Sequence, residues 1–558
     1  MQIQVKLSPL SVLLTPLIKY SLYLGWFSVA CLLQVTGEIT RAETLPEKQL
    51  AVGIVQRFGG KPTDELTLKA TPGDRITLEF LGGDLKTKTL TTDSVKLEIN
   101  MKPLAKPIVE ERVVLGTYRS FESAEDTAEK WRAKGIEVEI AHPDRWQVWA
   151  KRDIYKTPLL RRLLLQSLQA QGDKTAYIDS KILQQKPQAN WVLNGFRYNR
   201  DQLKITSTQN IIEIKEGNPD KNNPKPGTLY GGSLILQPNA YGTYTLVNQV
   251  PLETYLRGVV PHEIGADAPM AAIEAQAIIA RTYALRNLRR FAIDNYEMCA
   301  TVDCQVYKGL NAYPSSDQAI AATKGLVLTY NNELVDALYS STTGGITAPF
   351  TDVWNGAERP YLRAIIDSVE NIWDLSKQPL VDEQNFRKFI SLKKGFNESD
   401  WDVFRWQESS NLEEMTKFLK RYLQKKQGSP GNFNTIKQVQ IVRRSKAGRV
   451  LQMNVTTDTG VITVDKDDIR NAFYPPISTL FYIDPIYDGN KVIKGYTFIG
   501  GGFGHGVGLS QSGSYRLAKI GWSSERILSF YYPGTQLQPL NDAIIFWRSS
   551  SIPVEKKL

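Results

Sequence analysis

The chain has 558 residues, of which 42% are hydrophobic and 23% are charged, and this composition excludes a disordered or fibrous protein. Its length allows about two to four domains of roughly 100–200 residues each. The formal net charge of +10 favours an anionic partner. The basic residues form no arginine-rich tail, so we expect no nucleic acid and consider a membrane surface or an anionic wall polymer.

The first 45 residues (1–45) have the pattern of an export signal. Two apolar runs, 7–18 and 20–35, are separated by Lys19. The second run is short for a membrane span and suits the apolar part of a signal peptide, whereas both runs together could form an uncleaved anchor. We therefore predict an exported protein of the periplasm or cell envelope, whose leader is either removed or holds it at the inner membrane.

Residues 46–108 have the alternating pattern of short strands, for example at 51–58, 75–83 and 94–101, separated by Gly, Pro and Asp turns. We predict a small β-rich region there, without evident chemistry. In residues 109–180 the pattern changes to a strand, an amphipathic helix ending at Gly135, two strands and a second helix at 157–172. The segment GTYRSFESAEDTAEKWRAKG (116–135) resembles part of a SPOR domain, which implies binding to peptidoglycan strands without stem peptides. The alternative is an α+β connector.

A buried helix is predicted from about residue 269 to residue 288. Asp267 is its expected N-cap, and from Met270 onward nearly every residue favours a helix and no Gly or Pro interrupts it. The helix is apolar on almost all sides, apart from a sparse polar stripe that includes Gln276 and Tyr283. Glu263 stands just before it in the turn Pro-His-Glu-Ile-Gly. Its carboxylate either complements the helix dipole or takes part in chemistry.

The motifs around this helix are recognisable. They are NQVPLETYLRGVVPHEIG (248–265), AQAIIARTY (275–283), CQVYKG (304–309), YSSTTGGITAP (339–349) and GGGFGHGVGLSQSG (500–513). With these motifs, residues 226–540 resemble the SpoIID/LytB family, which includes sporulation lytic transglycosylases and amidase enhancers. The resemblance implies an α+β, predominantly β fold. Its core would cover 190–475, with a helical insertion near 385–430, and 476–558 would complete it with the GHGVGLSQ motif.

In this family the acid of the P-x-E turn is catalytic, so the resemblance implies that Glu263 is the acid/base of a peptidoglycan lytic transglycosylase. Such an enzyme cleaves the MurNAc–GlcNAc bond, preferably in strands without stem peptides, and needs no cofactor. Glycoside hydrolases usually pair two carboxylates, and no second one stands in a comparable turn here. A general acid needs a raised pKa, whereas the start of a helix lowers it, so burial has to outweigh the helix dipole.

The matched motifs also imply the residues that would bind substrate. These are Gln276, Arg281, Tyr283, Ser340, Ser341, Thr342, Thr343, Gly344, His505 and Gln511. Hydroxyls and backbone amides of the Ser/Thr turn suit sugar hydroxyls and acetamides, the alternative being an ordinary turn. The imidazole of His505 either binds substrate, holds Glu263 in place, or packs among glycines.

Cys299 and Cys304 can close a small loop in an exported protein, and are otherwise small buried apolar residues. Some members of the family bind zinc near CQVY through His and Cys. Because residues 296–309 contain no His, we expect no metal site there and prefer a Cys299–Cys304 disulfide. The expected partner is the peptidoglycan glycan strand. Two rival hypotheses are a non-catalytic enhancer, whose partner would be a cell-wall amidase, and a structural wall-anchoring protein.

Overall fold

The structure is a computed structural model that describes residues 47–217 and 226–548. The predicted leader (1–45) lies outside the described residues. The structure has more strand (36%) than helix (25%), which confirms the predicted α+β, predominantly β class. In the described ranges, none of the helices combines the length and the apolar character that crossing a bilayer requires.

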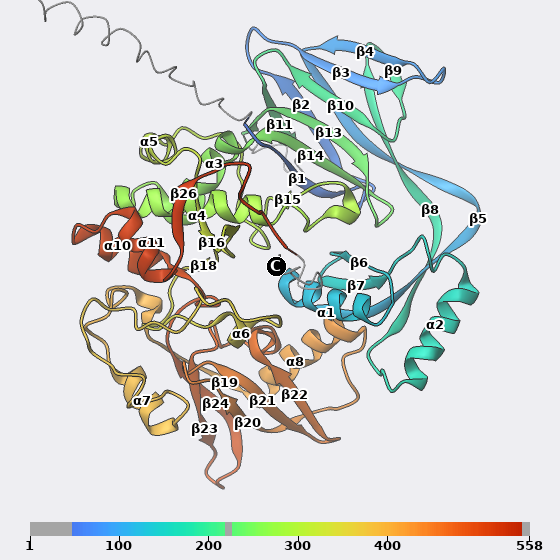
Figure 1. Cartoon of the computed structure of the whole chain (residues 1–558). Helices are drawn as coiled ribbons and strands as arrows, with labels where there is room; N and C mark the ends of the chain where they lie inside the picture. The colour runs from blue at the N-terminus through green and yellow to red at the C-terminus, as the bar shows by residue number, and fades with distance from the viewer. Residues whose placement is uncertain (1–46, 218–225, 549–558) are drawn as a thin grey trace, which may run out of the picture. The chain divides into compact units, whose positions relative to one another are not determined.

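Strands from residues 49–198 and from residues 203–251 pair with one another in two β-sheets (Figure 1). One sheet has the order β15-β1-β14-β13-β10-β3-β4, and the other has the order β12-β11-β2-β5-β7-β6, with β8 beside β5 and β9 beside β8. The strands of the first sheet are β1 (Gln49–Phe58), β3 (Ile76–Leu81), β4 (Thr87–Thr92), β10 (Leu203–Ser207), β13 (Ser233–Pro238), β14 (Tyr244–Pro251) and β15 (Met298–Cys299). Those of the second are β2 (Glu65–Ala70), β5 (Ser94–Tyr118), β6 (Val138–Ala141), β7 (Trp146–Ala150), β8 (Tyr177–Leu193), β9 (Phe196–Tyr198), β11 (Ile211–Glu216) and β12 (Thr228–Gly231).

Apolar side chains of both sheets, such as Leu68 and Leu78, belong to one buried cluster with Ile205 and Leu234. The stretches 46–108 and 190–250, which we assigned to different domains from the sequence, are therefore packed into one body.

The long strands β5 and β8 run from these sheets into the SPOR-like stretch. There α1 (Phe121–Ala133) follows β5, and α2 (Pro158–Ala170) follows β7, in the strand–helix–strand–strand–helix order that we expected. Ser120 caps α1, because its hydroxyl accepts a hydrogen bond from the Ser123 backbone N–H. Figure 1 shows α2 beside β5 and β8.

The predicted buried helix is α4 (Met270–Arg286), which follows α3 (Leu252–Val260) and a single π-turn, η1 (Pro261–Gly265). Most of its side chains are buried, as its apolar surface predicted. Its N-cap is Pro269 and not Asp267, so that prediction was wrong. Asp267 lies two residues before the cap, and no side chain caps this helix.

Residues 350–500 form a region with two three-stranded sheets. The sheets are β19-β24-β23 and β20-β21-β22, and apolar side chains of both pack with α8 (Leu412–Gln427) in one cluster. The elements are α6 (Phe350–Val353), α7 (Glu383–Ser391), β19 (Trp406–Asn411), β20 (Ile436–Arg444), β21 (Val450–Thr457), β22 (Val461–Asp465), η4 (Lys466–Asp468), α9 (Ile469–Ala472), β23 (Phe481–Tyr487) and β24 (Ile493–Gly500). The helices near 385–430 are thus part of a packed region.

The last segments return to α4. Helices α10 (Gln511–Lys519) and α11 (Ser524–Tyr531) pack on it, and β26 (Gln536–Pro539) pairs with β16 (Leu326–Tyr330), which also pairs with β17 (Glu333–Leu334). α5 (Pro314–Ala322) packs on the same helix. The two-residue strands β18 (Tyr339–Ser340) and β25 (Leu509–Ser510) pair in parallel and join the Ser/Thr turn to the glycine motif. Gly508 permits this approach: its φ is +75°, and a Cβ there would lie 1.9 Å from the Leu338 carbonyl oxygen.

Candidate active site

Glu263 borders a cleft of about 450 Å³. Six of the residues predicted from the sequence line this cleft, namely Glu263, Tyr283, Ser340, Ser341, His505 and Gln511. They come from η1, α4, β18 and its turn, the glycine motif and the start of α10. The fold thus brings several motifs together around one carboxyl group, although some of them are separated by almost half the length of the chain.

The Glu263 side chain is partly exposed and is held by two hydrogen bonds. Its Oε1 accepts the backbone N–H of Val306 at 2.6 Å, and the Tyr339 hydroxyl bonds to the same carboxyl. Both bonds favour the charged form, but burial is the larger effect and raises the pKa of Glu263 above its ordinary value. Burial therefore outweighs both hydrogen bonds at this carboxyl group.

The backbone of the Glu263 turn is fixed by α10. The Gln511 side-chain amide donates to the Glu263 carbonyl at 2.9 Å, and the Tyr515 hydroxyl donates to the carbonyl of Ile264. Gln276 is fully buried beside this contact, and its side-chain oxygen lies 3.4 Å from the Gln511 amide nitrogen. Gln276 therefore supports Gln511, and it does not line the cleft.

Ser340 and Ser341 present the polar part of the Ser/Thr turn to the cleft. The Ser340 hydroxyl is buried and has no hydrogen-bond partner among the described residues. The Ser341 carbonyl accepts both the backbone N–H and the hydroxyl of Ser512, at 3.1 and 2.8 Å. A buried hydroxyl without a protein partner at the edge of a cleft is able to bond a ligand.

His505 lies in the cleft wall as a neutral ring. Its Nδ1 accepts the Val507 backbone N–H at 3.0 Å, which leaves the ring proton on Nε2. Burial lowers the pKa of His505 to about 3, and the Trp354 ring packs 4.9 Å away between centroids. The hydrogen bond to Val507 and the contact with Trp354 hold the ring in place.

Four other predicted substrate contacts are corrected, because these residues do not line the cleft. Arg281 is fully buried and forms a bidentate ion pair with Glu253, at 2.7 and 2.8 Å, which ties α4 to α3. Thr342 accepts the Phe503 backbone N–H at 2.7 Å, and Thr343 bonds to Glu398. Gly344 packs against Gly501, with no space for a Cβ. These residues support the site without lining it. Of the Ser/Thr turn, only Ser340 and Ser341 reach the surface of the cleft.

Glu398 is a supporting residue that sequence reasoning missed. It is fully buried and accepts hydrogen bonds from the backbone N–H groups of Thr343 and Gly345 and from the hydroxyls of Thr343 and Ser510. Asp367 lies next to it, and burial together with the negative charge of Glu398 raises the pKa of Asp367 well above its usual range. Glu398 joins the Ser/Thr turn to Ser510, the N-cap of α10. Its surroundings, Asn-Glu-Ser-Asp, carry no motif that could have identified it.

The SPOR-like stretch also borders the cleft, which sequence reasoning did not predict. Arg119 and Glu122, at the start of α1, line it together with Arg290 and Asp467. Arg119 pairs with Asp467 at 3.1 Å, and Arg290 pairs with Glu122. One wall of the cleft therefore comes from residues 119–122, far from the family motifs in the chain.

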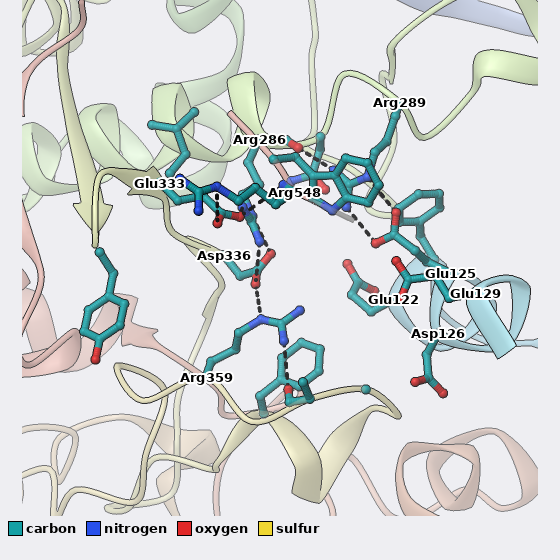
Figure 2. A pocket seen from close by; sticks show the side chains of 18 of the residues that line it. Glu122, Glu125, Asp126, Glu129, Arg286, Arg289, Glu333, Asp336, Arg359 and Arg548 are labelled. Carbon is teal, nitrogen blue, oxygen red and sulfur yellow. Dashed lines mark hydrogen bonds and ion pairs between the residues drawn. The ribbon is translucent and has the colours of Figure 1, made fainter. Parts of the chain in front are cut away.

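A second hollow, of about 640 Å³, is also bordered by residues at the start of α1. Figure 2 shows the carboxylates of α1, including Glu125, on one side with Arg289 above them, and Arg286 and Arg359 further across the hollow. Arg289 pairs with Glu125 at 2.6 Å, and Arg286 pairs with Asp336 at 3.0 Å. The two hollows share Phe121 and Glu122. The pair with Glu125 ties α1 to the segment that follows α4 and so helps to fix the wall that α1 provides, whereas the pair with Asp336 ties α4 to the segment that follows β17.

Cys299 and Cys304 form a disulfide in the structure. Cys304 lines the cleft, and Val306, two residues later, donates the hydrogen bond to Glu263. Among residues 47–217 and 226–548, no three His, Cys, Asp or Glu side chains are grouped so as to hold a metal ion.

Comparison with known proteins places these residues in a family. The model of the SpoIID family, described as stage II sporulation protein, matches residues 240–330, which include Glu263 and α4. Residues 240–330 are therefore a SpoIID-family domain. A second family model, a domain of unknown function (DUF8618), matches residues 348–508. It covers the region with two small sheets, including Glu398, and part of the glycine motif.

Three relatives of the chain are informative. An amidase enhancer of Bacillus subtilis is 30% identical over 297 residues, which are 50% of this chain and 40% of the enhancer. The chain therefore spans less than half the length of that relative. Stage II sporulation protein D of Bacillus subtilis is 27% identical over 334 residues, covering 56% of this chain and 83% of the relative. An uncharacterized protein of Brachyspira hyodysenteriae is 28% identical over 324 residues, or 56% of this chain and 74% of the relative.

Proposed function

We propose that this SpoIID-family protein is a peptidoglycan lytic transglycosylase in which Glu263 is the only acid/base. The proposal depends on one observation: the Glu263 carboxyl group borders a cleft, and burial raises the pKa of this group. A raised pKa keeps the group protonated closer to neutral pH, as a general acid requires. The proposed substrate is the MurNAc–GlcNAc strand, preferably without stem peptides, and the proposed location is the cell envelope after export.

The reaction needs one carboxyl group used twice. The protonated Glu263 carboxyl donates its proton to the glycosidic oxygen as the bond from that oxygen to C1 of MurNAc breaks. The C6 hydroxyl of the same sugar attacks C1, and its proton passes to the Glu263 carboxylate. The products are a 1,6-anhydro end and a free GlcNAc end, and Glu263 returns to its protonated state.

The other cleft residues have supporting roles in this proposal. The Ser340 hydroxyl and the Nε2–H of His505 are the candidate hydrogen-bonding groups for sugar hydroxyls or acetamides. The Gln511 amide donates a hydrogen bond to the Glu263 carbonyl, and Tyr283 lines the cleft. The SPOR-like stretch contributes Arg119 and Glu122 to the wall, so its proposed part in strand binding takes place at the cleft.

A direct test incubates the purified protein with peptidoglycan strands stripped by an amidase and measures anhydro ends by mass spectrometry. The Glu263→Gln variant keeps an oxygen that accepts the Val306 N–H but cannot transfer the proton. General acid–base catalysis contributes about 10²–10⁴-fold, and this group acts in both steps, so we expect a loss of at least about 10³-fold. Glu413→Gln, on the exposed face of α8, is the matched control and keeps full activity. Activity that survives Glu263→Gln refutes the assigned role.

The second candidate function is non-catalytic stimulation of a cell-wall amidase. It is favoured by the amidase enhancer among the relatives. In that case the protein forms no anhydro ends but raises the rate at which a purified amidase releases stem peptides, and Glu263→Gln leaves this stimulation unchanged. Measuring both products in the same reactions separates the two functions.

A further inference from the structure

Helix α2 and the adjoining part of the β5–β8 ribbon carry a group of exposed apolar side chains. On α2, Leu159 and Leu163 are 66% and 52% exposed, and Leu160 is also exposed. On the ribbon, Val109 and Ile182 are 54% and 67% exposed. Leucine and isoleucine side chains exposed to this extent and close together need an explanation beyond ordinary surface composition.

The register of the ribbon places these side chains together. Val109 and Ile182 are direct cross-strand partners, so they lie on one face of the ribbon. Glu111, two residues along β5, points to the same face and accepts hydrogen bonds from Arg161 and Arg162 of α2 at 3.3 and 2.9 Å. The N-terminal half of α2, with its exposed leucines, therefore lies next to Val109 and Ile182.

The charged groups around these side chains are predominantly basic. α2 contains Arg161 and Arg162 and no acidic residue. Exposed lysines flank it on the ribbon and before the helix, at Lys102, Lys106, Lys156 and Lys181. In the part of the ribbon next to α2, residues 102–118 and 177–186, the acidic residues are already in ion pairs: Glu111 with the two arginines, Asp179 with Arg112 at 3.3 Å, and Glu110 with Lys186 at 3.9 Å.

We propose that α2 and the adjoining β5–β8 ribbon, residues 102–110, 154–163 and 180–186, form a docking surface for an anionic lipid bilayer. A short helix with leucines on one side and basic residues beside them is typical of segments that lie in the membrane interface. The lysines would attract anionic headgroups, and the leucines would enter the boundary between headgroups and acyl chains. This inference does not depend on the proposed catalytic function.

The ribbon itself favours lipid over a protein partner. Ile108 is 43% exposed on the face opposite to Val109 and Ile182, so the ribbon is apolar on both sides. A docked protein domain covers one face of a two-stranded ribbon, whereas the interface of a bilayer surrounds an immersed segment. The leader expected from the sequence would bring the chain to the same membrane, and two weak attachments reinforce each other.

The test uses the full chain with a fluorophore that is sensitive to polarity. Cys31→Ser removes the one cysteine outside the disulfide, and Leu163→Cys provides the labelling site. The matched control is Leu85→Cys, a 78% exposed position between β3 and β4. With vesicles of phosphatidylglycerol and phosphatidylcholine we expect the emission at residue 163 to shift to shorter wavelength, and the emission at residue 85 to stay unchanged. Vesicles of phosphatidylcholine alone give a smaller shift.

A second variant tests the same surface without a label. Leu159→Gln, Leu160→Gln and Leu163→Gln together change only exposed positions, so folding is preserved and is checked by thermal unfolding. The wild-type protein and this triple variant have the same leader, so any difference in binding comes from the three leucines. We expect vesicle flotation to show at least about tenfold weaker binding of the triple variant to anionic vesicles.

Three results overturn the proposal. The first is an unchanged emission at residue 163 on anionic vesicles together with unchanged flotation of the triple variant. The second is an equal shift at residues 163 and 85, which indicates adsorption through another part of the chain. The third is a shift at residue 163 that needs no vesicles and grows with protein concentration, which indicates that a second copy covers this face.

Discussion

Removing the Tyr339 hydroxyl should make the protein more active at alkaline pH. Of the three influences on the pKa of Glu263, burial raises it, whereas the hydrogen bonds from Val306 and Tyr339 lower it. Tyr339→Phe removes one lowering influence and leaves the ring in place, so the pKa of Glu263 rises further. Because the first step of the proposed reaction needs the protonated carboxyl, activity falls as pH rises through this pKa, and the variant retains the proton to higher pH.

The size of the effect follows from the hydrogen bond that is lost. A hydrogen bond to a charged group contributes about 1.5–3 kcal/mol, and about 1.4 kcal/mol corresponds to a factor of ten in the protonated fraction. On the alkaline limb of the pH profile we therefore expect Tyr339→Phe to be about tenfold more active than the wild-type protein. Near the optimum, where Glu263 is already protonated, the two rates should be similar. The variant also leaves the Gln305 side-chain amide, 3.3 Å from the hydroxyl, without its acceptor, which costs about 1 kcal/mol of stability.

The assay measures anhydro ends from stripped glycan strands across the pH range for both proteins. Tyr487→Phe, at a 56% exposed tyrosine on β23, is the matched control and should have the wild-type profile. The reasoning is refuted if the alkaline limb of Tyr339→Phe moves to lower pH or does not move while thermal unfolding shows an intact fold. In that case a group other than Glu263 controls the alkaline limb.

Three further predictions concern residues that support the site. Glu398→Ala leaves two buried backbone amides and two hydroxyls without their acceptor, so we expect a loss of about 3 kcal/mol or more in denaturant unfolding; wild-type stability would contradict its role. Arg281→Ala removes the arginine that pairs with Glu253 and should cost about 3–5 kcal/mol; a stable variant with a raised KM would instead mean that Arg281 contacts substrate. Replacing both Cys299 and Cys304 by Ser opens a loop between positions five apart and should cost about 2 kcal/mol in thermal unfolding under oxidising conditions. For this pair, a melting temperature equal to that of the wild-type protein would show that the disulfide adds no stability.

Features that depend on neighbouring residues were predictable from the sequence. The buried helix α4 followed from a run of strong helix formers that is apolar on nearly all sides, and the structure places it at Met270–Arg286. The elements of the SPOR-like stretch followed in the same way from local periodicity. The Cys299–Cys304 pair, five residues apart, was predictable once export was assumed. Six of the expected site residues, including Glu263 and His505, were brought to one cleft.

The N-cap of α4 and the division into domains were less well predicted. Asp267 is a good capping residue in general, but Pro269 occupies the cap, so intrinsic preference was not decisive. Strands from 46–108 and 203–251 share two sheets, and no property of either stretch alone identifies the other as its partner. Strand pairing between distant segments depends on the whole fold, whereas strand propensity is local.

By itself the sequence indicated which segments form helices and strands, which helix is buried, and which acid stands in the turn just before that helix. The tertiary structure alone decided that burial raises the pKa of Glu263, that Arg281 turns away from the cleft, and that Glu398 and residues 119–122 complete the site. The physical reason is that helix formation and apolar periodicity act over a few residues. Desolvation, by contrast, and the partner of a buried charge depend on every atom nearby, and most of those atoms belong to segments far away in the chain.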